Sequence, residues 1–210
     1  MAEIRVKGTG TIKLFENDNT SSVTIASPAS LGGDRTITLP DADVTLVSGT
    51  MATTNGITVA DQWRLTTTFA GDAEPIASNL ERIDTTGMGT IGSAMTESSG
   101  IFTFPSTGIY KVEFVASFAL TAADSRYNIG RIQGTTNDSS YAEWGDQRTV
   151  LYDSGGASYS SCYGCVLVDV TDVSNVKVRF DSVVEDDNTS TRGNTDTNET
   201  FMTFTRLGDT

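Results

Sequence analysis

Apolar and polar residues alternate along much of this chain, and alternation with a period of two is the pattern of half-buried β-strands. The segment 109–120 shows it most clearly. One of its faces carries Tyr110, Val112, Phe114, Ala116, Phe118 and Leu120. Segment 174–185 repeats the pattern, with Val176, Val178 and Phe180 opposite Lys177, Arg179 and Asp181. Because no window of about 12 residues has the i, i+3, i+4, i+7 stripe of an amphipathic helix, the pattern predicts an all-β protein.

The longer strands are predicted in the second part of the chain. They are expected at 62–69, 80–84, 101–104, 109–120, 125–134, 141–153, 159–170, 174–185 and 199–207. The connecting loops, rich in Gly, Ser, Thr, Asp and Asn, are expected at 70–79, 85–100, 135–140 and 186–198. Strands of this number and spacing indicate a two-sheet sandwich, a jelly roll or a barrel.

Residues 1–50 have a different texture and are expected to form a short β-rich arm. Short alternating runs at 11–15, 22–26, 35–40 and 43–47 are separated by turn-forming clusters. Their apolar positions include Leu14, Ile25, Ile37, Leu39 and Leu46. Such small apolar faces cannot stabilise an isolated domain, so the arm must pack on the rest of the chain, on its own copies or on a larger assembly. We expect 51–61 to be a linker and 62–210 to be the main domain.

Composition and charge exclude several classes of function. The 210 residues carry a formal net charge of −13 without a basic cluster, which disfavours binding to nucleic acid. The chain has no His and no nucleophile or phosphate-loop motif, so we expect no enzymatic activity. No apolar run reaches the ~18 residues of a membrane span, and the first residues lack the apolar region of a secretory signal. We therefore expect synthesis in the cytoplasm and no insertion into a membrane.

The two cysteines, Cys162 and Cys165, form a C-x-x-C motif inside a predicted strand. Residues i and i+3 of a strand point to opposite faces and lie about 10 Å apart, too far for a disulfide. Because no other Cys or His could complete a zinc site, we interpret the pair as small residues of a strand.

Two further groups of residues are candidates for binding. Asp186, Asp187 and Asp196 could offer oxygen ligands to a calcium ion, although a solvated acidic loop is the favoured interpretation because no full calcium-loop spacing is present. Aromatic residues could form a carbohydrate-binding surface or pack in the core or between subunits. They are Trp63, Trp144, Tyr141, Tyr152, Tyr159 and Tyr163. Apart from calcium, no cofactor is expected.

The stretch from Gly100 to Phe114, GIFTFPSTGIYKVEF, resembles the core signature of the C1q/TNF-like jelly-roll superfamily. The closing run ETFMTFTRL at 199–207 is similar to the last strand of that superfamily. The resemblance covers roughly 62–210 and implies a jelly-roll sandwich that forms homotrimers. It places candidate residues at the seam between subunits, although some of them must fill the core of the monomer instead. They are Tyr110, Phe114, Phe118, Phe201 and Phe204.

The N-terminal segment resembles a different group. Its pattern of a strand, a polar turn, a strand, and then TITLPDADVTLV at 36–47 is similar to a segment found in many virion proteins of tailed phages. There it often precedes a distal domain of a fibre or decoration protein. The absence of a Gly-X-Y collagen repeat argues against an extracellular animal ligand.

Together these features predict a virion protein made in the cytoplasm of a bacterial host and carried on the virion surface. The first hypothesis is a trimeric capsid decoration, cement or head-fibre protein whose arm binds the major capsid protein or another virion protein. The second is a short tail fibre or adhesin that binds host surface glycan through loops 70–79, 85–100 and 186–198. A bacterial C1q-like lectin unrelated to virions is the third.

Overall fold

The computed structural model describes residues 11–15, 17–18, 20–26 and 56–210. The chain divides into two compact units, Met1–Met51 and Ala52–Thr210. Each unit has its own antiparallel strands.

The first unit contains a β-hairpin. Strands β1 (Thr11–Phe15) and β2 (Ser22–Ala26) pair antiparallel, with Thr11 opposite Ala26 and Phe15 opposite Ser22. In the turn, Asp18 Oδ1 accepts hydrogen bonds from the backbone N–H and the hydroxyl of Thr20, at 3.0 and 2.9 Å. The strands predicted at 11–15 and 22–26 are confirmed.

The apolar residues proposed for attachment of the arm fall into two groups. Leu14 and Ile25 lie on this hairpin with 57% and 54% of their surface exposed. Ile37, Leu39 and Leu46, with the strands predicted at 35–40 and 43–47, lie outside the described residues. Among the described residues, no helix has the length and apolar character that a membrane crossing requires.

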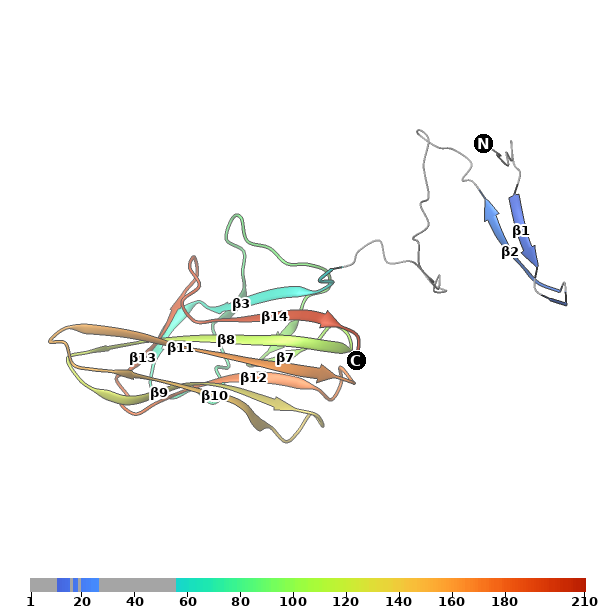
Figure 1. Cartoon of the computed structure of the whole chain (residues 1–210). Helices are drawn as coiled ribbons and strands as arrows, with labels where there is room; N and C mark the ends of the chain where they lie inside the picture. The colour runs from blue at the N-terminus through green and yellow to red at the C-terminus, as the bar shows by residue number, and fades with distance from the viewer. Residues whose placement is uncertain (1–10, 16, 19, 27–55) are drawn as a thin grey trace, which may run out of the picture. The chain divides into compact units, whose positions relative to one another are not determined.

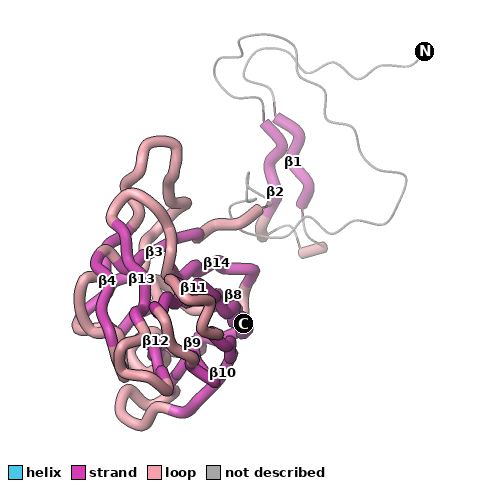
Figure 2. Tube along the Cα trace, turned by 90° about the vertical axis from the view of Figure 1, so that its left-hand side faces the viewer, coloured by secondary structure: helices cyan, strands magenta, loops and turns pink. Residues whose placement is uncertain are grey.

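The second unit is a sandwich of two antiparallel sheets, and Figure 2 shows only strands and loops in it. The five-stranded sheet has the order β10-β9-β12-β7-β6. Its strands are β6 (Thr96–Ser98), β7 (Ile101–Thr103), β9 (Ser125–Thr135), β10 (Ala142–Leu151) and β12 (Lys177–Val184).

The seven-stranded sheet has the order β4-β13-β8-β14-β3-β5, with β11 paired to β8 (Figure 1). Its strands are β3 (Ala60–Leu65), β4 (Thr67–Ala70), β5 (Leu80–Arg82), β8 (Gly108–Thr121), β11 (Ala157–Val170), β13 (Ser190–Asn194) and β14 (Phe201–Gly208). This arrangement confirms the predicted all-β jelly-roll sandwich.

Strand β8 organises the seven-stranded sheet. It pairs with β11 over its full length, from Gly108 opposite Val170 to Thr121 opposite Ala157. On its other side it pairs with β14 and β13. Its even-numbered residues from Gly108 to Leu120 are buried, as the alternation predicted, and face the other sheet.

Aromatic side chains join the two sheets in the core. Phe204 of β14 packs against Phe102 and Phe180 of the opposite sheet, with ring centroids 5.1 and 6.0 Å apart. Phe180 also packs on Phe114, at 5.0 Å. All four rings are at most 1% exposed. Edge-on and tilted packing of this kind adds to the free energy that burial of the rings already contributes.

The turn before β8 is built as its sequence predicts. Gly108 has φ +139°, a conformation that residues with a side chain rarely adopt. A Cβ at this position would lie 2.5 Å from the carbonyl oxygen of Gly208. The hydroxyl of Tyr110 reaches back to Ser106, whose hydroxyl lies 2.9 Å away. Glycine is therefore required for β8 to start against the end of β14.

The predicted strands were wrong at three places. The run 62–69 is two strands, because at Thr66 the backbone N–H leaves the ladder and donates to Asn79 O at 2.8 Å. Strands β6 and β13 fall in predicted loops, 85–100 and 186–198. Strand β13 has the sequence STRGN, which contains no large apolar residue, so hydrophobic periodicity could not reveal it.

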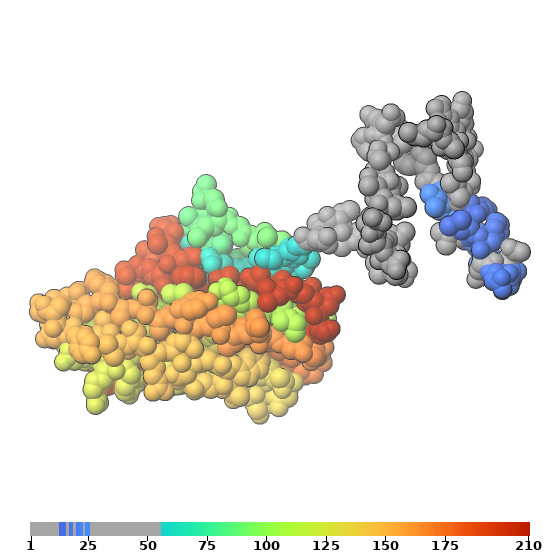
Figure 3. Space-filling view, viewed as in Figure 1, coloured from blue at the N-terminus to red at the C-terminus, as the bar shows by residue number. Residues whose placement is uncertain are grey.

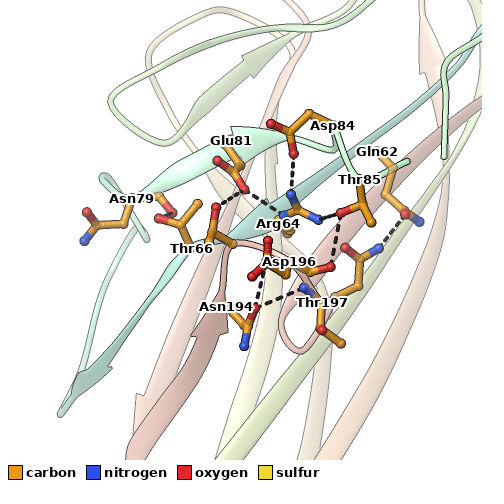
Figure 4. A network of polar contacts seen from close by, with 12 residues as sticks. Gln62, Arg64, Thr66, Asn79, Glu81, Asp84, Thr85, Asn194, Asp196 and Thr197 are labelled. Atoms are coloured by element: carbon orange, nitrogen blue, oxygen red, sulfur yellow. Dashed lines mark hydrogen bonds and ion pairs between the residues drawn. The ribbon is translucent and has the colours of Figure 1, made fainter. Parts of the chain in front are cut away.

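A polar network covers one end of the seven-stranded sheet (Figure 4). Arg64 on β3 is fully buried, and its guanidinium donates to Glu81 Oε1 at 2.8 Å, Asp84 Oδ1 at 2.6 Å and the Thr85 hydroxyl at 2.7 Å. Thr195 donates to Glu81 Oε1 at 2.9 Å. The network therefore fastens two segments distant in sequence, 80–85 and 194–198, over β3.

Candidate subunit interface

The outward face of the seven-stranded sheet carries large apolar side chains in solvent. They are most exposed on β11, where Tyr159, Tyr163 and Leu167 are 63%, 54% and 68% exposed. Side chains of a strand point alternately to its two faces, so the residues between them, such as Cys162 and Val168, face the core. Strand β11 forms part of the surface turned toward the viewer in Figure 3, in orange.

The outward face continues across β8 and β14. Strand register sets Tyr163 beside Val115, and Val115 beside Phe201. The next strand, β3, brings Arg64 beside Phe201. Because residues paired across neighbouring strands share a face, Tyr163, Val115 and Phe201 form an apolar row at the middle of the sheet.

A charged group adjoins this row. Lys111 Nζ lies 2.7 Å from Glu113 Oε1, and the Tyr163 hydroxyl donates to the same oxygen at 2.6 Å. Partial burial opposes the charged form of Glu113, but the hydrogen bonds from Lys111 and Tyr163 outweigh it and lower the pKa of the carboxyl. The hydrogen bond to Glu113 raises the pKa of Tyr163. The Tyr163 ring is therefore held in one place by an ionised partner.

Strand β11 is also an edge strand. It pairs only with β8, and no backbone hydrogen bond from its other side is found among residues 56–210. Its 14 residues carry a row of backbone groups without a strand partner, and β10 of the other sheet lies alongside. Proteins usually cover or interrupt such an edge, because it can pair with another chain. The exposed face and the open edge make β11 the candidate site of contact with a partner.

The residues predicted for the intersubunit seam lie on two different faces. Tyr110, Phe114, Phe118 and Phe204 are at most 1% exposed and belong to the core of the monomer, which is the alternative that the sequence left open for some of these residues. Phe201 alone lies on the outward face, half-buried beside Val115. The pattern could not separate the two faces, because both carry aromatic residues at alternating positions.

The prediction of the seam overlooked the tyrosines of the run 159–170. Tyr159 and Tyr163 are candidates for either a carbohydrate surface or an interface, and the structure shows both side chains exposed on β11. The other aromatic candidates are scattered: Trp63 packs edge-on against Phe102 in the core, and Tyr152 is 71% exposed in a loop.

The C-x-x-C motif lies on β11, as predicted. Cys162 is buried and Cys165 is exposed, and both thiols are free. Burial raises the pKa of the Cys162 thiol. The interpretation that these are residues of a strand with opposite orientations is confirmed.

The acidic loop residues proposed for calcium do not form a ligand group. Within the described residues, no cluster of three or more His, Cys, Asp or Glu side chains could hold a metal ion. Asp186 Oδ1 instead accepts from the backbone N–H of Asn188 at 2.8 Å. The backbone N–H of Asp196 donates to Asn194 Oδ1 at 2.7 Å. These local bonds shape the turns around β13.

A second group of charges lies on the outer face of the five-stranded sheet. Arg131 on β9 contacts Glu74, Glu143 and Asp146, and its Nη1 lies 3.5 Å from Asp181 Oδ2. Asp181 is fully buried, and neither of its carboxylate oxygens accepts a hydrogen bond. Burial raises the pKa of Asp181 to about 6, against the attraction of Arg179 and Arg131.

We expect Asp181→Asn to stabilise the protein at pH 8 by about 3 kcal/mol and to have little effect at pH 4. The raised pKa means that the folded state binds this proton more tightly than the unfolded state. The cost of ionising Asp181 therefore appears as pH rises from about 4 to about 6 and is fully present above that range. Thermal unfolding of the variant and the native protein at both pH values measures the difference, and an equal gain at both would contradict it.

Comparisons with known proteins agree with the architecture. No protein-family model matches the chain, and no curated protein matches its sequence. Among solved structures, the chain is similar to murine APRIL at pH 5.0, with 11% identity, a TM-score of 0.50, and coverage of 71% of this chain and 98% of that one. It is also similar to Eiger TNF from S. frugiperda, with 14% identity, a TM-score of 0.51, and coverage of 72% and 94%. At such low identity the likeness concerns the fold alone, and it shows that the second unit of this chain is a TNF-like jelly roll.

Proposed function

We propose that this chain is a non-enzymatic structural protein that assembles as a homotrimer through the outward face of β11, β8 and β14. The observation that carries the proposal is the exposure of Tyr159, Tyr163 and Leu167 on one edge strand. Large apolar side chains gathered on one face mark a site of association rather than a surface meant for water. The likeness to TNF-like jelly rolls favours three copies over two.

The cellular setting of the proposal is the surface of a tailed-phage particle. In this role the trimer is a capsid decoration, cement or head-fibre protein, and the arm at 1–50 attaches it to the major capsid protein or another virion protein. The exposed Leu14 and Ile25 on the β1–β2 hairpin support this role, because a hairpin with uncovered apolar residues needs a surface to pack on.

The trimer is tested by replacing Tyr163 with lysine. We expect the mass in solution to fall from three chains to one, because three added charges would be buried near one another in the interface. The lone subunit should keep its fold, since Tyr163 is half exposed in it and a lysine there can pair with Glu113. Multi-angle light scattering gives the mass, and far-ultraviolet circular dichroism reports the fold.

Tyr152→Lys is the matched control. Tyr152 is 71% exposed and lies between β10 and β11, off the outward face of the sheet. This variant should stay trimeric. A native protein that is monomeric, or a Tyr163→Lys variant that remains trimeric, would refute the proposed interface.

The virion role is tested by the number of copies of the protein in each particle. Quantitative mass spectrometry of purified particles should find the protein at the copy number of capsid surface sites. A copy number typical of tail fibres would reject decoration and favour the adhesin. A glycan array on the recombinant trimer separates the two further: reproducible binding, abolished by substitutions in loops 70–79, 85–100 and 186–198, would support the adhesin instead.

A further inference from the structure

A groove of about 500 Å³ opens between β10 and β11, at the edge of the sandwich where the two sheets separate. Trp144, Val166 and Leu167 supply its apolar surface above the buried Val168, and Thr136, Glu143 and Asp169 supply its polar part. The volume falls in the range of sites that bind small ligands or single side chains. The groove lies within one copy of the chain.

The ring of Trp144 is placed in this groove by two features of the backbone. The register between β10 and β9 shifts from Glu143 to Gly145, which leaves Trp144 as the extra residue of a β-bulge. The ring then lies directly on Gly134, where a Cβ would come within 2.0 Å of the six-membered ring. Bulges redirect side chains in this way, often beside functional sites. Only glycine at 134 lets the ring lie on the neighbouring strand.

The polar part of the groove is acidic, and its two carboxylates differ. Glu143 is already paired, with Oε2 2.9 Å from Arg131 Nε. Asp169 is exposed, and its carboxylate makes no hydrogen bond or ion pair to any residue in the described part of the chain. One carboxylate without a side-chain partner therefore lines the same groove as Trp144 and Leu167.

We infer that this groove binds the side chain of an arginine or lysine on a basic segment of a partner protein. The aliphatic stem of such a side chain matches the surface of Trp144, Val166 and Leu167. Its cationic head can pair with Asp169 and lie over the indole ring. The net charge of −13 attracts a basic partner and repels an acidic one. The inference goes beyond the proposed function. Because Leu167 belongs to both the groove and the proposed interface, it requires that the trimer leave the groove open.

The binding test uses the full-length protein labelled with 5-fluorotryptophan. The chain has two tryptophans, so two fluorine signals are expected, and Trp144→Phe assigns them. Trp63 is the internal reference, because its indole N–H is held by Asp61 Oδ2 at 3.0 Å and Arg82 lies over its ring. A tripeptide with a central arginine should shift the Trp144 signal saturably and leave that of Trp63 in place. The same peptide with citrulline, which lacks the charge, should shift neither.

The contribution of Asp169 is tested with Asp169→Asn, which should weaken binding of the arginine peptide about threefold, the usual range for an exposed ion pair. Asp187→Asn is the matched control, because Asp187 is an exposed acid elsewhere and the net charge changes equally. Fluorescence anisotropy of a labelled arginine peptide measures affinity for both variants and for Trp144→Ala, which should bind much more weakly.

Several results would overturn the inference. They are an equal response to the citrulline peptide, an equal loss of affinity in Asp187→Asn, or an absence of any saturable shift at Trp144. A shift of Trp144 by a neutral oligosaccharide alone would identify a sugar site instead. A change of mass in Trp144→Ala or Asp169→Asn would show that the groove lies between copies. Since mass is measured separately, a failure of the trimer proposal is distinguished from a failure of this one.

Discussion

Replacing Phe204 with alanine is expected to lower the free energy of unfolding by about 3–5 kcal/mol. Phe204 is fully buried on β14, and its ring contacts Phe102, Phe104 and Phe180. Since these partners come from the other sheet and from the segment that leads to β8, they cannot close around the space that the lost ring leaves. Chemical denaturation monitored by circular dichroism measures the change.

Phe201→Ala is the matched control for this prediction. It removes the same side chain from the same strand, but Phe201 lies on the outward face and is only partly buried within the subunit. We expect a much smaller loss of subunit stability, together with weaker association if the outward face is the interface. Equal losses of unfolding free energy in both variants, measured at matched mass in solution, would show that the two faces of β14 are wrongly assigned.

Replacing Arg64 with alanine is expected to cost about 2–3 kcal/mol of stability, because it removes charge-assisted hydrogen bonds made by a buried guanidinium. Arg64 is fully buried and donates to Glu81, Asp84 and Thr85. Without the guanidinium, the Glu81 carboxylate loses its cationic partner. Asp84 adds little to this cost, because its side chain is 78% exposed and water replaces the guanidinium.

The measurement for Arg64→Ala is thermal and chemical denaturation, with hydrogen exchange to locate the loosened segments. We expect faster exchange in residues 80–85 and 194–198, which the network joins. Arg148→Ala is the control: its side chain is 66% exposed and pairs with Asp146 on the same strand, so stability should hardly change. A similar small effect in both variants would mean that the network does not hold these segments.

The four residues that these substitutions replace fall into two groups. Phe204 and Arg64 support the fold of a single subunit, whereas Tyr163 and Trp144 concern what the subunit contacts. Variants at Tyr163 and Trp144 should therefore leave the unfolding of the subunit largely intact. This separation makes the functional experiments interpretable, because loss of binding is not confused with loss of folding.

The sequence by itself determined the class of fold and much of its internal pattern. Alternation in 109–120 predicted which residues of β8 share a face, and the structure buries Tyr110, Phe114 and Phe118 together. The glycine at 108 predicted the turn that starts the strand, because its φ is one that other residues avoid. Local periodicity and local backbone preference carry this information, so one sequence suffices to read it.

The tertiary structure alone decided which faces are core and which are surface. Phe201 and Phe204 are three residues apart on one strand and so point in opposite directions, but only the pairing of β14 with β8 and β3 shows which of them meets the other sheet. Strand β13 exists because its backbone pairs with β4 and β8, without any apolar signal in its sequence.

The candidate interface and the groove also depend on the tertiary structure. The open edge of β11 appears only when the order of strands is known, and the groove needs the bulge at Trp144 to meet Gly134 across two strands. Each depends on contacts between residues far apart in the chain. A pattern along the sequence records how often side chains alternate, but it does not record which strand lies beside which, and that pairing is what creates an interface or a groove.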